Sequence, residues 1–128
     1  MSEWFSVEEL LCRCGRADCD ALQTVTAELL RRADECRRRY GAPMIVTSGL
    51  RCRLWNDRVG GRPDSEHLTG EALDIRCTSS TNRYALLDAA FQAGFRRVGL
   101  ARNFLHLGVS HVLAQDVLWT YPPKAAPA

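Results

Sequence analysis

The sequence lacks any long apolar run. No stretch approaches the ~18 consecutive apolar residues that a bilayer-spanning helix requires. The N-terminal segment, MSEWFSVEELLC, also lacks the basic region and apolar core of a secretory signal, because it begins with acidic and amphipathic character. We therefore expect a chain with no membrane span that is synthesised in the cytoplasm without a signal peptide.

A strong excess of one charge is missing as well. The 17 Lys and Arg residues nearly balance the 15 Asp and Glu residues, which leaves a net charge of +2. Such a chain has no overall field that would attract nucleic acid or an anionic membrane, so neither is expected as a partner. The arginines are grouped locally, as at residues 37–39, where we expect them on the solvated face of a helix.

Internal repeats are also absent, and the length points to one folded unit. The 128 residues, 46% of them hydrophobic, can bury one core but are too few for two comfortable domains. We expect a single monomeric domain over residues 1–121. Residues 122–128, PPKAAPA, are expected to form a disordered tail.

Six cysteines raise the question of disulfides or a second metal site. They are Cys12, Cys14, Cys19, Cys36, Cys52 and Cys77. Because the chain has a core and no export signal, reduced thiols are our default. The triplet in CRCGRADC has C-x-C-x4-C spacing, which lacks the usual C-x2-C pair and a fourth ligand, although Cys36 or Cys52 would supply one by folding back. Free thiols in a loop, a disulfide and a structural zinc site therefore remain open there.

The spacing of apolar residues predicts two long helices and five short strands. Ser6 with Glu9 forms a capping box that opens a short helix. Longer helices are predicted over residues 20–40 and from a cap at Thr81 or Asn82 to about residue 93. Strands are predicted over residues 44–48, 72–77, 97–101, 104–109 and 117–121, with residues 49–65 mostly loop around a helical turn near Trp55. This order predicts an α+β fold with helices packed on a small, mostly antiparallel sheet.

Two histidines and an aspartate form a candidate metal site. His67 and Asp74 lie seven residues apart around Gly70 in SEHLTGEALD, and His106 stands in the apolar run FLHLGV. Either histidine alone would suit an ordinary surface or core position. Together, two imidazoles and one carboxylate leave a zinc ion with an open coordination position, as catalytic zinc sites require. Gly70 permits a tight course of the backbone between the first two residues, so we predict Zn²⁺ bound by His67, Asp74 and His106.

These motifs carry a resemblance to a known family. The segment TSGLRCRLWNDRVGGRPDSEHLTGEALDIRC, with the later GLARNFLHLGV and DVLWTY, resembles the zinc D-Ala-D-Ala carboxypeptidases of peptidase family M15, most closely the small single-domain members from bacteria and phages. The likeness extends from FSVEEL to WTY. It implies the Hedgehog/DD-peptidase fold, a zinc cofactor and peptidoglycan peptides as substrates. It also implies that Arg51, in S-G-L-R, polarises the scissile carbonyl and that Ser65 contacts substrate.

The acid or base that peptide hydrolysis needs is not where the resemblance implies it. Relatives place an acid three residues before the last histidine, a histidine two before, or an aspartate two after, and here those positions hold Asn103, Phe104 and Gly108. Asp64, Glu66, Glu71 or His111 would have to substitute. We expect Glu66 and Glu71 to be solvated, because the immediate neighbours of a ligand on a strand or tight turn point away from it. An aspartate at position 108 is therefore expected to raise turnover, unless Gly108 needs a special φ or the new carboxylate captures the metal.

The sequence thus predicts a zinc metallopeptidase that hydrolyses peptidoglycan stem peptides, as a D-Ala-D-Ala carboxypeptidase or an endopeptidase. It would act on the cell wall after release, as phage or prophage lysis proteins do. The alternative is a zinc-binding cell-wall or phage structural module with weak or no turnover, which the missing base favours.

Overall fold

The computed structural model describes residues 2–122, and the part of the predicted tail beyond them lies outside the described residues. Within this range the chain forms helices and strands in the order α1 (Val7–Leu10), α2 (Ala27–Tyr40), β1 (Val46–Ser48), α3 (Arg53–Arg58), β2 (Ala72–Arg76), α4 (Ser80–Gln92), β3 (Arg97–Leu100), β4 (Phe104–Gly108) and β5 (Val117–Thr120). None of the helices in the described range has both the length and the apolar character needed to cross a bilayer.

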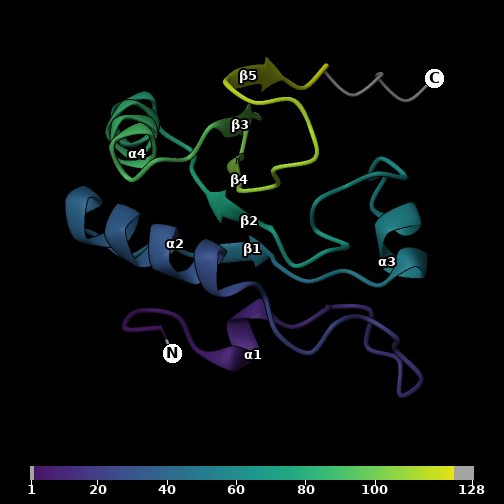
Figure 1. Cartoon of the computed structure of the whole chain (residues 1–128). Coiled ribbons are helices and arrows are strands. Elements are labelled where there is room, and N and C mark those ends of the chain that lie inside the picture. The colour runs from purple at the N-terminus through teal and green to yellow at the C-terminus, as the bar shows by residue number, and fades with distance from the viewer. Residues whose placement is uncertain (1, 123–128) are drawn as a thin grey trace.

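The strands form one sheet in the order β1-β2-β4-β3-β5 (Figure 1). Neighbouring strands are antiparallel except for β3 and β5, which are parallel. The predicted α+β class with a mostly antiparallel sheet is therefore confirmed. The central pair is β2 with β4, in which Asp74 lies directly opposite His106.

The two faces of the sheet have opposite character, because side chains alternate along each strand. One face carries Leu73, Ile75, Leu105 and Leu107, all at most 1% exposed, and packs in one core cluster with residues of α2 and α4. Figure 1 shows α2 and α4 together on this side and α3 with its adjoining loop on the other. The second face therefore carries the polar residues of β2 and β4 under cover of loops.

The strand predictions agree with the structure to within two residues, but the predicted start of the long helix at residue 20 is wrong. α2 begins at Ala27, where the Thr26 side chain accepts the backbone N–H of Leu29. The Thr26 backbone N–H donates to the carbonyl of Gly70, at 2.9 Å. This tie to the loop before β2 holds the preceding residues out of the helix. The cap of α4 is likewise Ser79, not Thr81 or Asn82.

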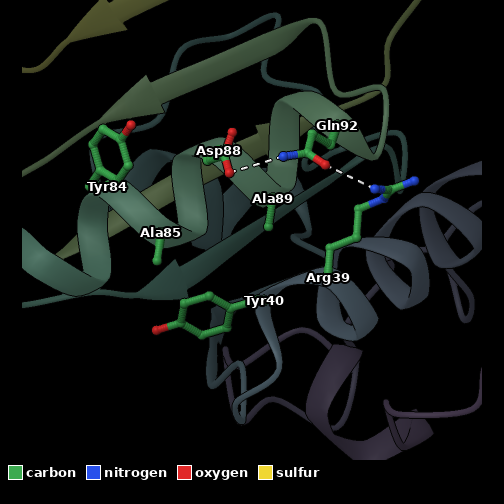
Figure 2. A pocket seen from close by; sticks show the side chains of 7 residues that line it. All are labelled: Arg39, Tyr40, Tyr84, Ala85, Asp88, Ala89 and Gln92. Atoms are coloured by element: carbon green, nitrogen blue, oxygen red, sulfur yellow. Dashed lines mark hydrogen bonds between the residues drawn. The ribbon is translucent and has the colours of Figure 1, made fainter.

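A groove of about 440 Å³ lies between the C-terminal half of α2 and α4 (Figure 2). Gln92 of α4 joins the two walls by accepting from Arg39 of α2, and it also donates to Asp88 on its own helix. The groove belongs to the helix side of the molecule, away from the polar face of the sheet. We assign no function to it, because Asp88 is the only acidic, histidine or cysteine side chain in its lining and therefore cannot hold a metal ion alone.

Candidate metal centre

Three buried side chains converge on the polar face of the sheet. Asp74 from β2 and His106 from β4 are cross-strand partners, and His67 approaches from the turn before β2. Asp74 Oδ1 lies 3.1 Å from His67 Nε2 and 3.1 Å from His106 Nδ1. The donor atoms all lie within 4.8 Å of one another, so one metal ion can contact all three.

The backbone around His67 fixes which of its nitrogens faces the centre. His67 Nδ1 lies 2.7 Å from the carbonyl oxygen of Gly49, which can only accept, so Nδ1 carries the proton and Nε2 offers its lone pair. Gly70 has φ of 72°, in the left-handed region, and a Cβ there would lie 3.2 Å from the backbone of Thr24 and Val25. The tight course predicted for this glycine is therefore present.

Glu66 corrects the expectation of a solvated carboxylate. It is only 3% exposed, and its Oε2 lies 2.7 Å from His106 Nε2. Arg97 Nε donates to the same oxygen at 3.1 Å, and the backbone N–H of Ser110 donates to Oε1 at 3.1 Å. Because His106 Nε2 donates its proton to Glu66, Nδ1 offers its lone pair to the centre. This is the outer carboxylate that commonly orients a metal-binding histidine.

Gly108 is the second correction, because the space expected for an acid there is already filled. A Cβ on Gly108 would lie 2.1 Å from Glu66 Oε2. The carboxylate of Glu66 therefore occupies the space that an aspartate side chain would need, and it does so on the Nε2 side of His106. This close approach explains the glycine, since the φ of Gly108 lies outside the left-handed region.

Burial and neighbouring charges act against each other on the pKa values of these groups. Burial alone would raise the pKa of Asp74, but the two histidines hold that pKa well below its usual value. Burial likewise opposes the lowered pKa of Glu66, which results from His106, Ser110 and Arg97. Burial lowers the pKa of His67, whereas the negative charges of Asp74 and Glu66 outweigh burial and raise the pKa of His106. Both carboxylates are thus held in the ionised form.

Arg51 lies beside the three converging residues and is held from three sides. Its Nη2 donates to Asp74 Oδ2 at 3.2 Å, and its Nε donates to Ser48 at 3.0 Å. Its Nη1 donates at 3.0 Å to Asn56 Oδ1, which belongs to a completely buried side chain on α3. Sequence reasoning missed Asn56, and only the spacing of five residues from Arg51 into a helical turn would have pointed to it.

Ser65 lies two residues before His67, and its hydroxyl oxygen accepts the backbone N–H of His67 at 3.2 Å. It is partly buried. This contact orders the turn that carries the first histidine, while the hydroxyl proton remains available to an acceptor.

Two aromatic residues near the centre were not predicted as site residues. The ring of Trp119 lies 5.2 Å from that of His106, and Gly99 stands between their strands in the sheet. A Cβ on Gly99 would lie 2.6 Å from Trp119 Nε1 and 2.8 Å from the Tyr121 hydroxyl. Burial raises the pKa of Tyr121, and the charge of Asp74 adds to this effect. The spacing of two residues between Trp119 on β5 and Tyr121 just after it was the available signal.

The other predicted substitutes for the base lie elsewhere. Asp64 is exposed and pairs with Arg62, and Glu71 accepts a hydrogen bond from Thr69. His111 is exposed and pairs with Glu28, at 2.7 Å. His111 is therefore a surface residue, and none of these three contacts the candidate metal ligands.

Comparison with known proteins identifies a family but no individual relative. No match is found among curated proteins. The family model described as Peptidase M15 matches residues 3–109 of the 128-residue chain, which include every candidate ligand of the centre. The chain belongs to the peptidase M15 family.

Proposed function

We propose that this domain is a zinc-dependent peptidase that hydrolyses peptide bonds of peptidoglycan stem peptides, as a D-Ala-D-Ala carboxypeptidase or an endopeptidase. The observation that carries the proposal is the convergence of His67 Nε2, Asp74 Oδ1 and His106 Nδ1 on one point. In this proposal these three atoms hold the zinc ion.

The donor set fits zinc. Two neutral imidazole nitrogens and one carboxylate oxygen are ligands that zinc prefers, and three protein ligands leave a coordination position open. The proton on each ring is fixed away from the centre, on His67 by the Gly49 carbonyl and on His106 by Glu66. When bound there, zinc would supply Lewis acidity and lower the pKa of a water molecule toward ~7.

Arg51 is suited to stabilise the negative charge that develops on the carbonyl oxygen during hydrolysis. A guanidinium carries five N–H donors. The contacts to Ser48, Asn56 and Asp74 use one each. The remaining donors lie on a group that is held rigidly beside Asp74, which is the preorganised arrangement that makes such donors effective. We therefore assign to Arg51 the role of carbonyl polarisation.

The proposal of a peptidoglycan substrate rests on the motifs that this chain shares with the D-Ala-D-Ala carboxypeptidases, S-G-L-R and S-x-H-x2-G-x-A-x-D. In that setting Ser65 contacts the substrate through its hydroxyl group. The protein would be made in the cytoplasm and reach the cell wall on release, as in phage or prophage lysis.

One observation favours a second candidate function, a zinc-bearing cell-wall or phage structural module with weak turnover. Positions 103, 104 and 108 hold no acid or base. Glu66 contacts His106 through Nε2, whereas the metal side of the ring is Nδ1, so its carboxylate is directed away from the reacting atoms. The phenol of Tyr121, which lies close enough to Asp74 for that charge to affect its pKa, is then the group to test as the proton donor or acceptor in catalysis.

The two functions differ in the release of amino groups from purified peptidoglycan. The enzyme proposal expects release by the zinc-loaded protein and none after chelation. Arg51→Ala should retain zinc and lose hydrolysis by about 10²-fold or more, the usual cost of one transition-state donor. Arg51→Lys should recover only part of the lost hydrolysis, because lysine lacks the planar guanidinium with its paired N–H donors. Zinc-loaded protein that releases nothing while still binding the cell wall would favour the second function.

A further inference from the structure

A second group of metal-ligating side chains lies apart from the histidine and aspartate centre. Cys12, Cys14 and Cys19 of the N-terminal loop meet Cys52, the residue after Arg51. All six cysteines of the chain are unbridged, and Cys36 lies in the apolar core on α2, so it is not the fourth member. We propose that Cys12, Cys14, Cys19 and Cys52 bind a structural zinc ion.

The convergence of four sulfur atoms is the first argument. Their Sγ atoms all lie within 4.8 Å of one another. Zinc with four thiolates at ~2.3 Å places the sulfur atoms about 3.8 Å apart, so a small contraction would complete a tetrahedron. Disulfides would bring the sulfur atoms together in pairs and would not require all four to gather at one point.

Backbone N–H groups directed at the sulfur atoms are the second argument. The N–H of Cys52 donates to Cys12 Sγ at 3.3 Å, and the N–H of Arg16 donates to Cys14 Sγ at 3.4 Å. The N–H of Trp55 donates to Cys52 Sγ at 3.4 Å. Such donors stabilise the negative charge of metal-bound thiolates, as outer hydrogen bonds do at other metal sites. Gly15, with φ of 72°, allows the turn that directs the Arg16 N–H back to Cys14.

The loop itself is the third argument. Residues 11–25 form neither helix nor strand, and within the described structure their peptide groups make one backbone-to-backbone hydrogen bond outside regular elements, from Cys19 to Arg16. Ordered loops of this length without secondary structure are uncommon and need another source of order. Zinc bound by three loop cysteines and Cys52 would supply it, and each binding thiol would release its proton to solvent.

The site has a consequence for the neighbouring centre. Cys52 follows Arg51 directly and its sulfur caps α3, the helix that carries Asn56. A metal ion at Cys52 would therefore fix the start of α3 and the backbone of Arg51. The site shares no donor with His67, Asp74 and His106, so the two metal sites can be emptied separately.

Metal content separates the sites. The protein is made in a reducing cytoplasm with added zinc and purified without chelator, and zinc and iron per chain are then measured. We expect about two zinc ions per chain for the unaltered protein and about one for Cys14→Ser. Asp74→Ala should also hold about one, and the combined variant about none. Cys36→Ala, a buried cysteine outside the cluster, is the matched control and should keep about two.

A second measurement covers the case in which Cys14→Ser does not fold. The unaltered protein is loaded with cobalt, whose thiolate charge-transfer absorption reports sulfur ligands directly and should be the same in Asp74→Ala. We also expect the cluster thiols to resist a thiol reagent until a strong chelator is added. One zinc ion per chain that is lost entirely in Asp74→Ala, cobalt without the thiolate band, or a mass showing disulfides would each overturn the proposal. Loss of peptidase activity alone would not bear on it.

Discussion

At the scale of single residues, Glu66 determines how His106 is presented to the candidate metal. Its carboxylate is buried, accepts from His106 Nε2 at 2.7 Å, and is held in turn by Arg97 and the Ser110 N–H. It therefore sets both the ring orientation and the protonated nitrogen of the last ligand.

Glu66→Gln should keep the shape of this contact but lose its charge. We expect zinc affinity to fall by about 10-fold to 100-fold, the usual cost of losing an outer hydrogen-bond partner, while the fold is retained. Competition with a coloured zinc chelator measures the affinity. Glu71→Gln is the control, because that carboxylate contacts Thr69 and not a ligand. Equal affinities in the two variants would reduce Glu66 to a packing role.

The second prediction at this scale concerns Gly108. Because a Cβ there would lie 2.1 Å from Glu66 Oε2, Gly108→Ala should destabilise the protein by about 1–3 kcal/mol and weaken zinc binding. Gly108→Asp should lower turnover, whereas the sequence pattern alone predicted a gain. Denaturant unfolding measures the change in stability, zinc titration measures the change in zinc binding, and hydrolysis kinetics measure the turnover.

A double variant provides the control for Gly108. If the cause is the overlap with Glu66, the cost of Gly108→Ala should shrink in a Glu66→Ala background, since the two residues are in contact. Purely additive costs would assign the effect to the backbone at position 108 instead.

The buried position of Glu66 was not predictable from the rule that the immediate neighbour of a ligand points away from it. That rule assumes alternating side chains next to His67, but residues 66–70 form turns in which neighbours can point to the same side. His67, Asp74 and His106, by contrast, were recognisable because the last two lie on regular strands where spacing fixes the face.

At the scale of elements, α3 positions Arg51. Asn56 on this helix accepts from Arg51 Nη1 and donates to the carbonyl of Arg62 at 2.8 Å. Gly61 is required here, because a Cβ would lie 2.0 Å from Asn56 Oδ1. The helix and the following turn together form a buried clamp on the guanidinium.

Asn56→Ala should therefore lower turnover without removing zinc. The loss should not exceed the ~10²-fold expected for Arg51→Ala, and combining both substitutions should add little, because Asn56 acts through Arg51. Hydrolysis kinetics and zinc content are measured together. Asp57→Ala on the same helix serves as the comparison. A combined loss equal to the product of the single losses would mean that Asn56 acts independently.

The strands were the most predictable elements, because β2 and β4 combine an apolar run with turn residues at each end. The start of α2 was not, because Leu22 and Val25 continue the helical spacing although they precede the Thr26 cap. The meeting of Cys52 with Cys12, 40 residues away, depends on tertiary packing and no local pattern encodes it.

At the scale of the whole molecule, the sheet separates stability from chemistry. Its apolar face forms one core cluster with α2 and α4, while the candidate metal centre occupies the other face. The core does not depend on the metal ligands, so we expect the protein to remain folded after chelation, unlike small domains that fold only with zinc.

The last prediction follows from this division. Zinc binds the centre in the folded protein and not in the unfolded chain, so a zinc concentration about 100 times the Kd of this site should stabilise the folded protein by about 2.7 kcal/mol. Thermal unfolding of the chelated protein should be cooperative, and zinc should raise its Tm. The rise should be smaller in Asp74→Ala, which lacks one ligand, than in the unaltered protein. Comparing each variant with and without zinc removes the cost of the substitution itself. Chelated protein without a cooperative transition would show that metal binding, and not the α2 and α4 core, holds the fold together.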